Sequence, residues 1–451
     1  MAAPKTAEKL NVRLDNNTYE GQTRDRIVIS RTMVNSKRTQ KLEIYFKRTV
    51  RVTDNGSGNE LPPGLGSFPV YSIEDYKNTL PAHMVAKQGY FIPMHQREAM
   101  WIKFSCQQPF AIKIYVGGVN AVSGEPARET TETMMRRLKL TQQRKSIQDY
   151  VVAPEQMWLD GIACGDEKVR QFVAMPLGEG YSVEAHITGE EVVGGLQFEV
   201  TPTHHEPQKV HYCYGLGSAP EGVDTFRISV ITLEGSEYHF KVHAGNNFSC
   251  VKEMMEEMTG VPPYEQRLIY GGRQMHDHFT LGQQAIVEGA RLHQVLRLTG
   301  GGCPTMGIAV GGLIRQTVKR DKQSPSIWQP DCGTIFNVQI LNSSYFQEVT
   351  GLPPPPTPVT AETYSDYGYP YFKMFDETPS GVQGAFAGIK SVNEMDVDGK
   401  PSAEKAKAVA EVSKNTNNPV VLLDEKARRV GFRTVLDLEM AVRKRFAKMK
   451  V

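Results

Sequence analysis

The 451-residue sequence has no run of about 18 apolar residues, so nothing in it predicts a helix that spans a membrane. Charge of either sign is also not in excess, since 52 basic side chains face 50 acidic ones. A balanced charge gives no overall field that would favour nucleic acid. The first residues, MAAPKTAEKL, are polar and lack the apolar segment of a secretory signal. We therefore expect neither a transmembrane segment nor a nucleic-acid partner.

Cysteine is scarce, with six residues scattered without close spacing. In a chain this long the pattern is typical of reduced thiols, and so of the cytoplasm or nucleus. One cluster has residue types that bind zinc, and it consists of His204, His205, His211 and Cys213. Its spacing matches no zinc module that we can name. We favour a solvated linker at 204–223 over a metal site and predict no cofactor.

Catalytic motifs are absent as well. The sequence has no G-x-S-x-G elbow, no H-E-x-x-H pair and no phosphate loop. Residues 294–451 contain no histidine. We predict that the protein is not an enzyme, and a ligand-binding or enzymatic role of the N-terminal β-rich region stays open as a weaker alternative.

The N-terminal half is predicted to be rich in strands. Residues 1–22 are predicted as a flexible arm. Residues 23–203 hold many short β-branched and aromatic runs between turn clusters, which favours a mostly-β sandwich or barrel. Near 125–150 this pattern gives way to charged residues and good helix formers, which predicts a polar helical insertion.

The middle of the chain carries the most specific pattern. Residues 226–231 and 238–242 alternate with period two around Glu234-Gly235, which predicts a hairpin. A helical stripe then follows, with Asn247 at the N-cap position and Gly260 at the stop; it consists of Phe248, Val251, Met255 and Met258. RLIYGG and RLHQVLRL predict two further strands. The order strand, strand, helix, strand, strand predicts a small mixed sheet over one helix.

These residues resemble ubiquitin over 226–302 without a gap, on the run VPPYEQRLIYGGRQM, the TLEG turn and the tail LRLTGG. The resemblance implies a β-grasp fold and an apolar patch that ubiquitin-binding proteins recognise. The patch falls on Leu233, Ile269, His293 and Val295, with Arg267 and Arg297 beside it. The resemblance also implies a processing or conjugation tail at Gly300, Gly301 and Gly302.

The stretch departs from the family at the lysines on which ubiquitin chains are built. Six of these positions hold other residues, namely Ile231, Ser236, Met254, Met258, Arg273 and Glu288. Lys252 alone remains, at a position that the resemblance implies to be largely buried. The resemblance therefore implies that this domain does not carry ordinary polyubiquitin chains.

The rest of the chain gives architecture only. We predict an α+β multidomain protein, with a mixed irregular domain at 303–395 that holds a proline-rich loop, a linker at 396–418 and a helical segment at 419–451. That segment has an apolar stripe of Val435, Leu438, Val442 and Phe446, which we expect to dock on its own domain. The alternative is that its basic end binds a partner helix, an anionic membrane or nucleic acid. Several fragments between 96 and 202 resemble a module of fungal proteins that also carry a ubiquitin-like domain.

Two functions stay open. The first is an adaptor or scaffold that binds ubiquitin-binding proteins or receptors of the ubiquitin–proteasome pathway through the patch. The second is the precursor of a modifier that is cut after the Gly300–Gly302 run. Self-cleavage at Cys303 is not expected, because the residues after it supply no histidine. The sequence predicts neither the oligomeric state nor the individual partners.

Overall fold

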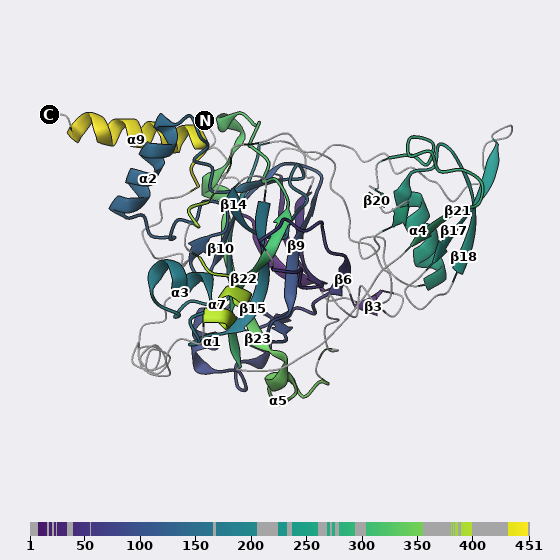
Figure 1. The fold of residues 1–451 in the computed structure, drawn as a ribbon, viewed down its shortest axis with the longest axis horizontal. Helices are drawn as coiled ribbons and strands as arrows, with labels where there is room; N and C mark the ends of the chain where they lie inside the picture. Colours follow the sequence, from purple (N-terminus) through teal and green to yellow (C-terminus); the bar gives the residue numbers. More distant parts are fainter. Residues whose placement is uncertain are drawn as a thin grey trace, which may run out of the picture.

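In the computed structural model, the described residues divide between one large sheet and one small sheet (Figure 1). The structure describes residues 8–15, 18–19, 22–23, 25–33, 39–54, 56–165, 168–204, 224–231, 237–259, 268–270, 273–275, 279–293, 304–353, 355, 380, 382, 384–386, 389–398 and 432–449. A separate short hairpin joins β2 (Thr18–Tyr19) and β3 (Gln22–Thr23).

The large sheet has 16 strands, and its main path uses segments from before and after the stretch that forms the small sheet (Figure 1). In spatial order the path runs through β1 (Asn11–Asp15), β4 (Arg26–Thr32), β5 (Thr39–Thr49), β9 (Ala99–Cys106), β15 (Lys168–Pro176), β22 (Thr305–Arg315), β23 (Thr334–Asn342), β16 (Leu196–Pro202), β10 (Phe110–Val116) and β11 (Val119–Asn120). Side branches are β6 (Gly64–Ser67), β7 (Tyr71–Ser72), β8 (Tyr90–Met94), β12 (Val151–Ala153), β13 (Trp158–Leu159) and β14 (Gly161–Gly165). The predicted strand-rich character of the N-terminal half agrees with this arrangement.

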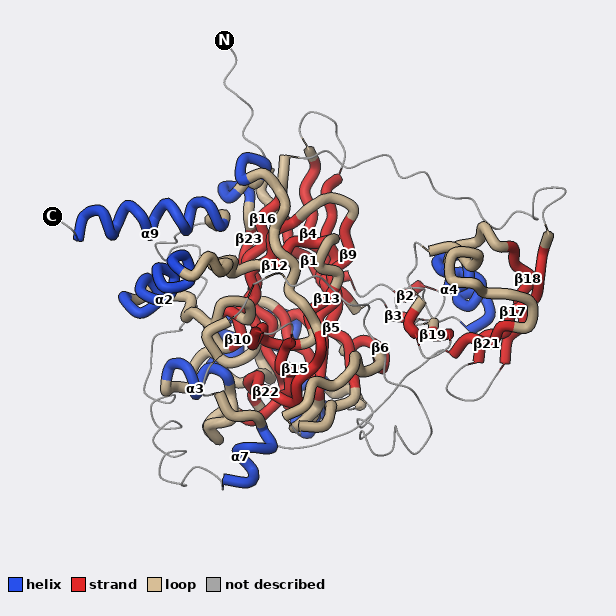
Figure 2. The backbone as a smooth tube through the Cα atoms, turned by 45° about the horizontal axis from the view of Figure 1, so that its top comes forward, coloured by secondary structure: helices blue, strands red, loops and turns tan. Residues whose placement is uncertain are grey.

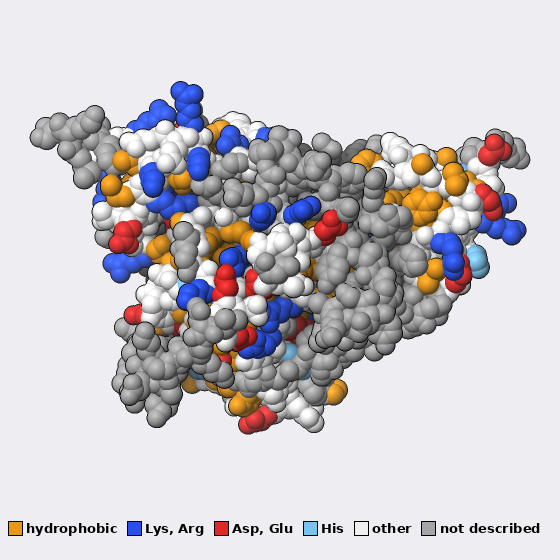
Figure 3. Space-filling view, viewed as in Figure 1, with side chains coloured by type: hydrophobic (Ala, Val, Ile, Leu, Met, Phe, Trp, Pro, Cys, Tyr) orange, Lys and Arg blue, Asp and Glu red, His pale blue; other side chains and the backbone are white. Residues whose placement is uncertain are grey.

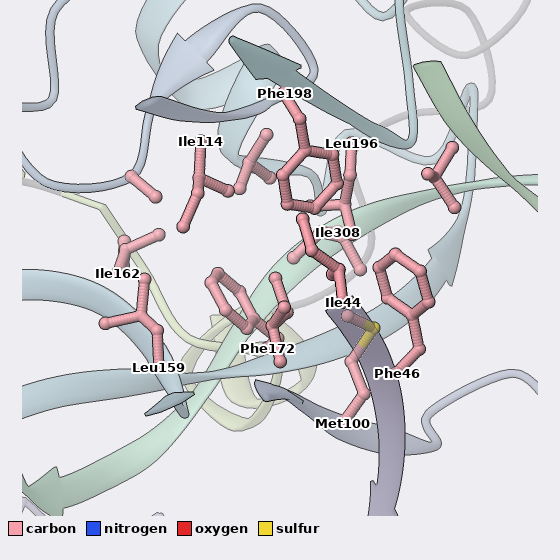
Figure 4. Packing of buried hydrophobic residues seen from close by; sticks show 14 of the residues in the cluster. Ile44, Phe46, Met100, Ile114, Leu159, Ile162, Phe172, Leu196, Phe198 and Ile308 are labelled. Carbon is pink, nitrogen blue, oxygen red and sulfur yellow. The ribbon is translucent and has the colours of Figure 1, made fainter. Parts of the chain in front are cut away.

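One continuous apolar core lies inside the large sheet (Figure 4). Phe172 of β15, Ile308 of β22 and Phe198 of β16 converge there and are essentially inaccessible to solvent. The Phe46 and Phe198 rings meet edge to face, with their centroids 6.0 Å apart. Because β22 contributes to this core as fully as β15 does, the core needs residues from before and after the small sheet.

The predicted separate domain at 303–395 does not match this strand pairing. β22 pairs with β15 along its length, and β23 pairs with β16 and β8. Further along, Val382, Phe386 and Ile389 are buried in the same core. The predicted arm at 1–22 differs too, since β1 pairs with β4. The physical reason is that sheet partners are chosen by burial, which local sequence pattern does not specify.

Helices cover the outside of the large sheet. They are α1 (Ala82–Lys87), α2 (Thr131–Gln142), α3 (Val183–Thr188), α5 (Phe346–Thr350), α7 (Val392–Asp398) and α9 (Val435–Met449). α2 lies inside the predicted polar insertion, and Thr130 caps it by accepting a hydrogen bond from the Thr133 backbone N–H. None of the helices in the described ranges combines the length and apolarity needed to cross a bilayer.

The C-terminal elements dock on the large sheet. α7 is held by Asp396, which pairs with Arg97 and accepts a hydrogen bond of 2.9 Å from the Tyr181 hydroxyl. Before α9, the Phe432 ring packs against Tyr150, with the centroids 4.9 Å apart. Leu438 of α9 is fully buried beside Leu140 of α2, and Figures 1 and 2 both show these helices side by side. The contacts agree with the expected docking of this helix; the side chain of Phe446 lies outside the described residues.

The small sheet is built from one contiguous stretch. Its strands are β17 (Thr225–Ile231), β18 (Glu237–His243), β19 (Ile269–Tyr270), β20 (Arg273–Gln274) and β21 (Ala290–His293), with α4 (Phe248–Thr259) between β18 and β19 in sequence. The spatial order is β18-β17-β21-β19-β20, and β17 runs parallel to β21. This arrangement confirms the predicted β-grasp topology.

Candidate protein-binding site on the small sheet

The inner face of the small sheet is a core that fixes the position of the outer face. Ile228 and Val230 of β17 and Leu292 of β21 are buried against α4. Their alternation leaves Arg227 exposed and Ile231 partly exposed. The period-two pattern thus buries one side of the strand, while on the other side Arg227 and Ile231 reach the surface and Ser229 between them is covered.

α4 begins as predicted and presents a slightly narrower apolar face than predicted. The Asn247 side chain accepts a hydrogen bond of 2.9 Å from the Cys250 backbone N–H, which confirms the N-cap. Phe248, Val251 and Met255 are fully buried. Met258 is 58% exposed, so the prediction that it continues the buried stripe is wrong. The helix leaves the core before its last turn, and Gly260 lies outside the described residues.

The register of the small sheet brings together two of the predicted patch residues. Ile269 of β19 pairs directly with His293 of β21. Residues in direct register share a face of the sheet, so these two positions are neighbours on one surface although 23 residues separate them in the sequence. Leu233, Arg267, Val295 and Arg297 lie outside the described residues, and their places in the patch stay a prediction.

Charged side chains gather around β18 at the edge of the small sheet (Figure 3). The Arg291 guanidinium donates to both carboxylate oxygens of Glu237, at 3.2 and 3.1 Å. The pKa of Glu237 lies below its ordinary value because the Ser229 hydroxyl and then the Arg291 guanidinium hydrogen-bond to it. His239 and Lys241 are exposed on β18 nearby. In this part of the face, Arg291 and Glu237 are therefore paired with each other across the strands.

The glycine run Gly300–Gly302 lies outside the described residues, but the residues directly after it are placed. The Pro304 carbonyl accepts a hydrogen bond of 2.8 Å from the Asn342 backbone N–H. The hydroxyl of Thr305, at the start of β22, lies 2.8 Å from Nε2 of His83 on α1. A histidine thus stands beside this segment after all, supplied by the N-terminal half of the chain rather than by 294–451.

The histidine-rich linker is almost wholly outside the described residues. His204 is placed and exposed, and its backbone N–H donates to the Ile327 carbonyl. His205, His211 and Cys213 are not among the described residues. Within the described ranges, no group of three or more histidine, cysteine, aspartate or glutamate side chains is arranged to hold a metal ion.

Sequence pattern did not reveal the charged groups inside the large sheet. The Arg48 guanidinium donates twice to Glu98 Oε1, at 2.7 and 2.5 Å, and the His95 backbone N–H donates to Oε2. Burial raises the pKa of Glu98 to about 7. Lys113 Nζ lies 3.0 Å from Asp149 in a second buried pair. Both pairs join separate segments of the body, so we interpret them as part of its architecture.

Comparison with known proteins agrees with the geometry of the small sheet. The family model described as "Ubiquitin family" matches residues 228–299. The stretch is 40% identical over 74 residues to the NEDD8-like protein RUB1 of Saccharomyces cerevisiae, covering 16% of this chain and 96% of that protein. It is 42% identical over 76 residues to ubiquitin-like protein 1 of Schizosaccharomyces pombe, covering 17% of this chain and 97% of that protein. Through the domain at 228–299, the chain therefore belongs to the ubiquitin family.

Proposed function

We propose that the protein is an adaptor whose ubiquitin-like domain is a permanent part of the chain. The domain presents the face that holds Ile269 and His293 to ubiquitin-binding proteins, including receptors of the ubiquitin–proteasome pathway. The large sheet is the platform that carries it, and we propose no catalytic role for either part. An adaptor of this kind acts inside the cell, where such partners are found.

The observation that supports this proposal most is the place of the domain in the chain. The chain leaves the large sheet after β16 and returns to it as β22. Both of these strands pair with β23. The ubiquitin-like domain is thus an insertion into another fold. An insertion connected at both ends is suited to being displayed, because its release requires a cut on each side.

The alternative is a precursor that is cut after Gly302. Its support is the Gly300–Gly302 run itself and the similarity to proteins named as NEDD8-like. The closeness of His83 to Thr305 adds a base near the following segment. A single cut would still leave β22 and β23 seated between β15 and β16. The precursor hypothesis therefore requires a second cut before residue 224 to free the domain.

An immunoblot of the native protein with a different tag at each end separates the two hypotheses. The adaptor predicts one full-length band that carries both tags. A discrete cut between Gly300 and Pro304 that disappears in Gly301→Ala would overturn the adaptor. If such a cut also occurs in the purified protein and disappears in His83→Ala, the chain itself performs it.

Binding is tested with the substitution Ile269→Ala in the full chain. We expect it to lower capture of purified ubiquitin-binding domains at least 10-fold, since it removes an apolar side chain that the resemblance places in the patch. Arg291→Ala is the matched control, because Arg291 lies on the same outer face within the charged, ion-paired part. Equal capture by Ile269→Ala and the unsubstituted chain would remove this face from the proposed function.

A further inference from the structure

Ile231 is a residue of the small sheet to which neither the resemblance nor the comparisons assign a role in binding. It is the last residue of β17 and is partly exposed. It does not belong to the buried core of the small sheet, to which its neighbour Val230 contributes. Part of its side chain therefore lies at the surface, on the side of β17 that faces away from α4.

The register places Ile231 in one row with the predicted patch. Ile231 pairs with His293 across the parallel strands β17 and β21, and His293 pairs with Ile269 across β21 and β19. On the other side, Ile231 pairs with Glu237 of β18. Four strands therefore carry one row, which reads Glu237, Ile231, His293 and Ile269.

This row is the boundary between two kinds of surface. The neighbouring row holds Ser229 in register with Arg291, and Arg291 reaches Glu237 through its two hydrogen bonds. The Arg291 charge on that side is thus paired within the domain. Within the row, the positions of Ile231 and Ile269 lie on either side of His293, so three neighbouring strands carry two aliphatic residues.

We infer that Ile231 is a specificity-determining residue that widens the apolar patch beyond the one that ubiquitin presents. The inference rests on the proposed function, because it concerns the same face. The resemblance places a lysine at this position in chain-building ubiquitin. Some binding partners place an acidic side chain against that lysine. With isoleucine at residue 231, such a partner loses the ion pair, and its carboxylate is desolvated against an apolar side chain. The partner that fits is a ubiquitin-binding domain with an aliphatic or aromatic side chain opposite residue 231.

The experiment measures affinities of the full-length chain for a panel of purified ubiquitin-binding domains by biolayer interferometry. The chains compared are the unsubstituted protein, Ile231→Lys, Ile231→Val and Ile269→Ala. We expect Ile231→Lys to lower the affinity of the domains that bind the unsubstituted chain by about 10-fold. The same substitution should raise the affinity of domains that have an acidic contact residue. Ile231→Val should keep every affinity within about threefold, since it preserves shape and polarity.

The outcomes distinguish this inference from the proposed function. If Ile269→Ala abolishes binding while Ile231→Lys leaves the panel unchanged, residue 231 does not determine specificity and the adaptor proposal stands. If Ile269→Ala changes nothing, or no domain binds the unsubstituted chain, both ideas fail. A dimer of the full chain that Ile231→Lys dissociates, measured by light scattering, would assign the surface to self-association and overturn the inference. Thermal unfolding of the Ile231→Lys chain confirms that it is folded.

Discussion

The two sheets of this protein are assembled in opposite ways. The small sheet takes all of its described strands from residues 225–293, in one uninterrupted stretch. The large sheet places β22, from after that stretch, directly beside β15 and in the same core. The small sheet can therefore form from local contacts, whereas the large sheet must join segments more than 100 residues apart.

The two sheets also differ in where an ion pair lies. In the large sheet, the ion pair of Arg48 and Glu98 is buried, with side-chain exposures of 7% and 1%. In the small sheet, the pair of Arg291 and Glu237 lies at the surface, with exposures of 62% and 33%. Buried pairs are costly to break, and exposed pairs contribute little. The large sheet thus holds an ion pair in its interior, whereas this pair of the small sheet lies at its surface.

The largest effect should come from cutting the chain on one side of the insertion. We expect removal of residues 303–451 to abolish cooperative unfolding of the large sheet, because β22 and β23 lie in the middle of its strand order. Replacing residues 226–302 by a 20-residue Gly/Ser linker, with a span of about 25 Å, should leave the large sheet folded. Circular dichroism with thermal unfolding checks both. A truncated chain that unfolds cooperatively like the full one would contradict the description of a single composite core.

A smaller effect is expected from Glu98→Ala in the large sheet. The substitution removes the carboxylate that holds the buried Arg48 guanidinium, and such a loss typically costs about 3–5 kcal/mol. Urea unfolding of the full chain, monitored at the large sheet, provides the measurement. Unchanged stability would show that the interior pair does not hold β5 to the segment before β9.

The stability of the large sheet should also depend on pH through Lys87. Burial lowers the pKa of Lys87 to about 8, although its Nζ donates to the Val192 and Val193 carbonyls. Between this value and the ordinary 10.5 the unfolded chain binds more protons, so the free energy of unfolding should rise with pH in that window. We expect a rise of about 1–3 kcal/mol from pH 7.5 to 10. Urea unfolding of the unsubstituted chain and of Lys87→Met at both pH values provides the check. The Lys87→Met chain should lack most of this rise in the free energy of unfolding.

The smallest effect is expected from Arg291→Ala in the small sheet. Since its pair with Glu237 is exposed, the substitution should change the free energy of unfolding by less than about 1 kcal/mol. Thermal unfolding of the full chain at low and high salt measures it. A loss as large as that of Glu98→Ala would end the contrast between the two sheets.

Particular elements show how far prediction from the sequence reached. The hairpin, the Asn247 cap and three of the four residues of the α4 stripe were predicted correctly, because each depends on residues only a few positions apart. The predicted independence of 303–395 and of the arm at 1–22 did not match the strand pairing of β22, β23 and β1. Each of these strands carries a normal alternating or apolar pattern, but the pattern does not name its partner.

For the candidate site, the resemblance pointed to Ile269 and His293 from matching motifs, and the register placed them opposite each other. Ile231 was noted only as a missing lysine, since nothing in the linear sequence joins it to residues 38 and 62 positions away. His83 was missed for the same reason. Its approach to Thr305 spans 222 positions.

The sequence by itself determined the ubiquitin-like domain, because a contiguous fold is encoded in local periodicity, caps and turns. Only the tertiary structure decided that this domain is inserted into the large sheet and that Ile231 shares a row with the patch. Both facts depend on strand pairing between distant segments. That pairing is selected by burial of a common core, and no single segment of the sequence contains it.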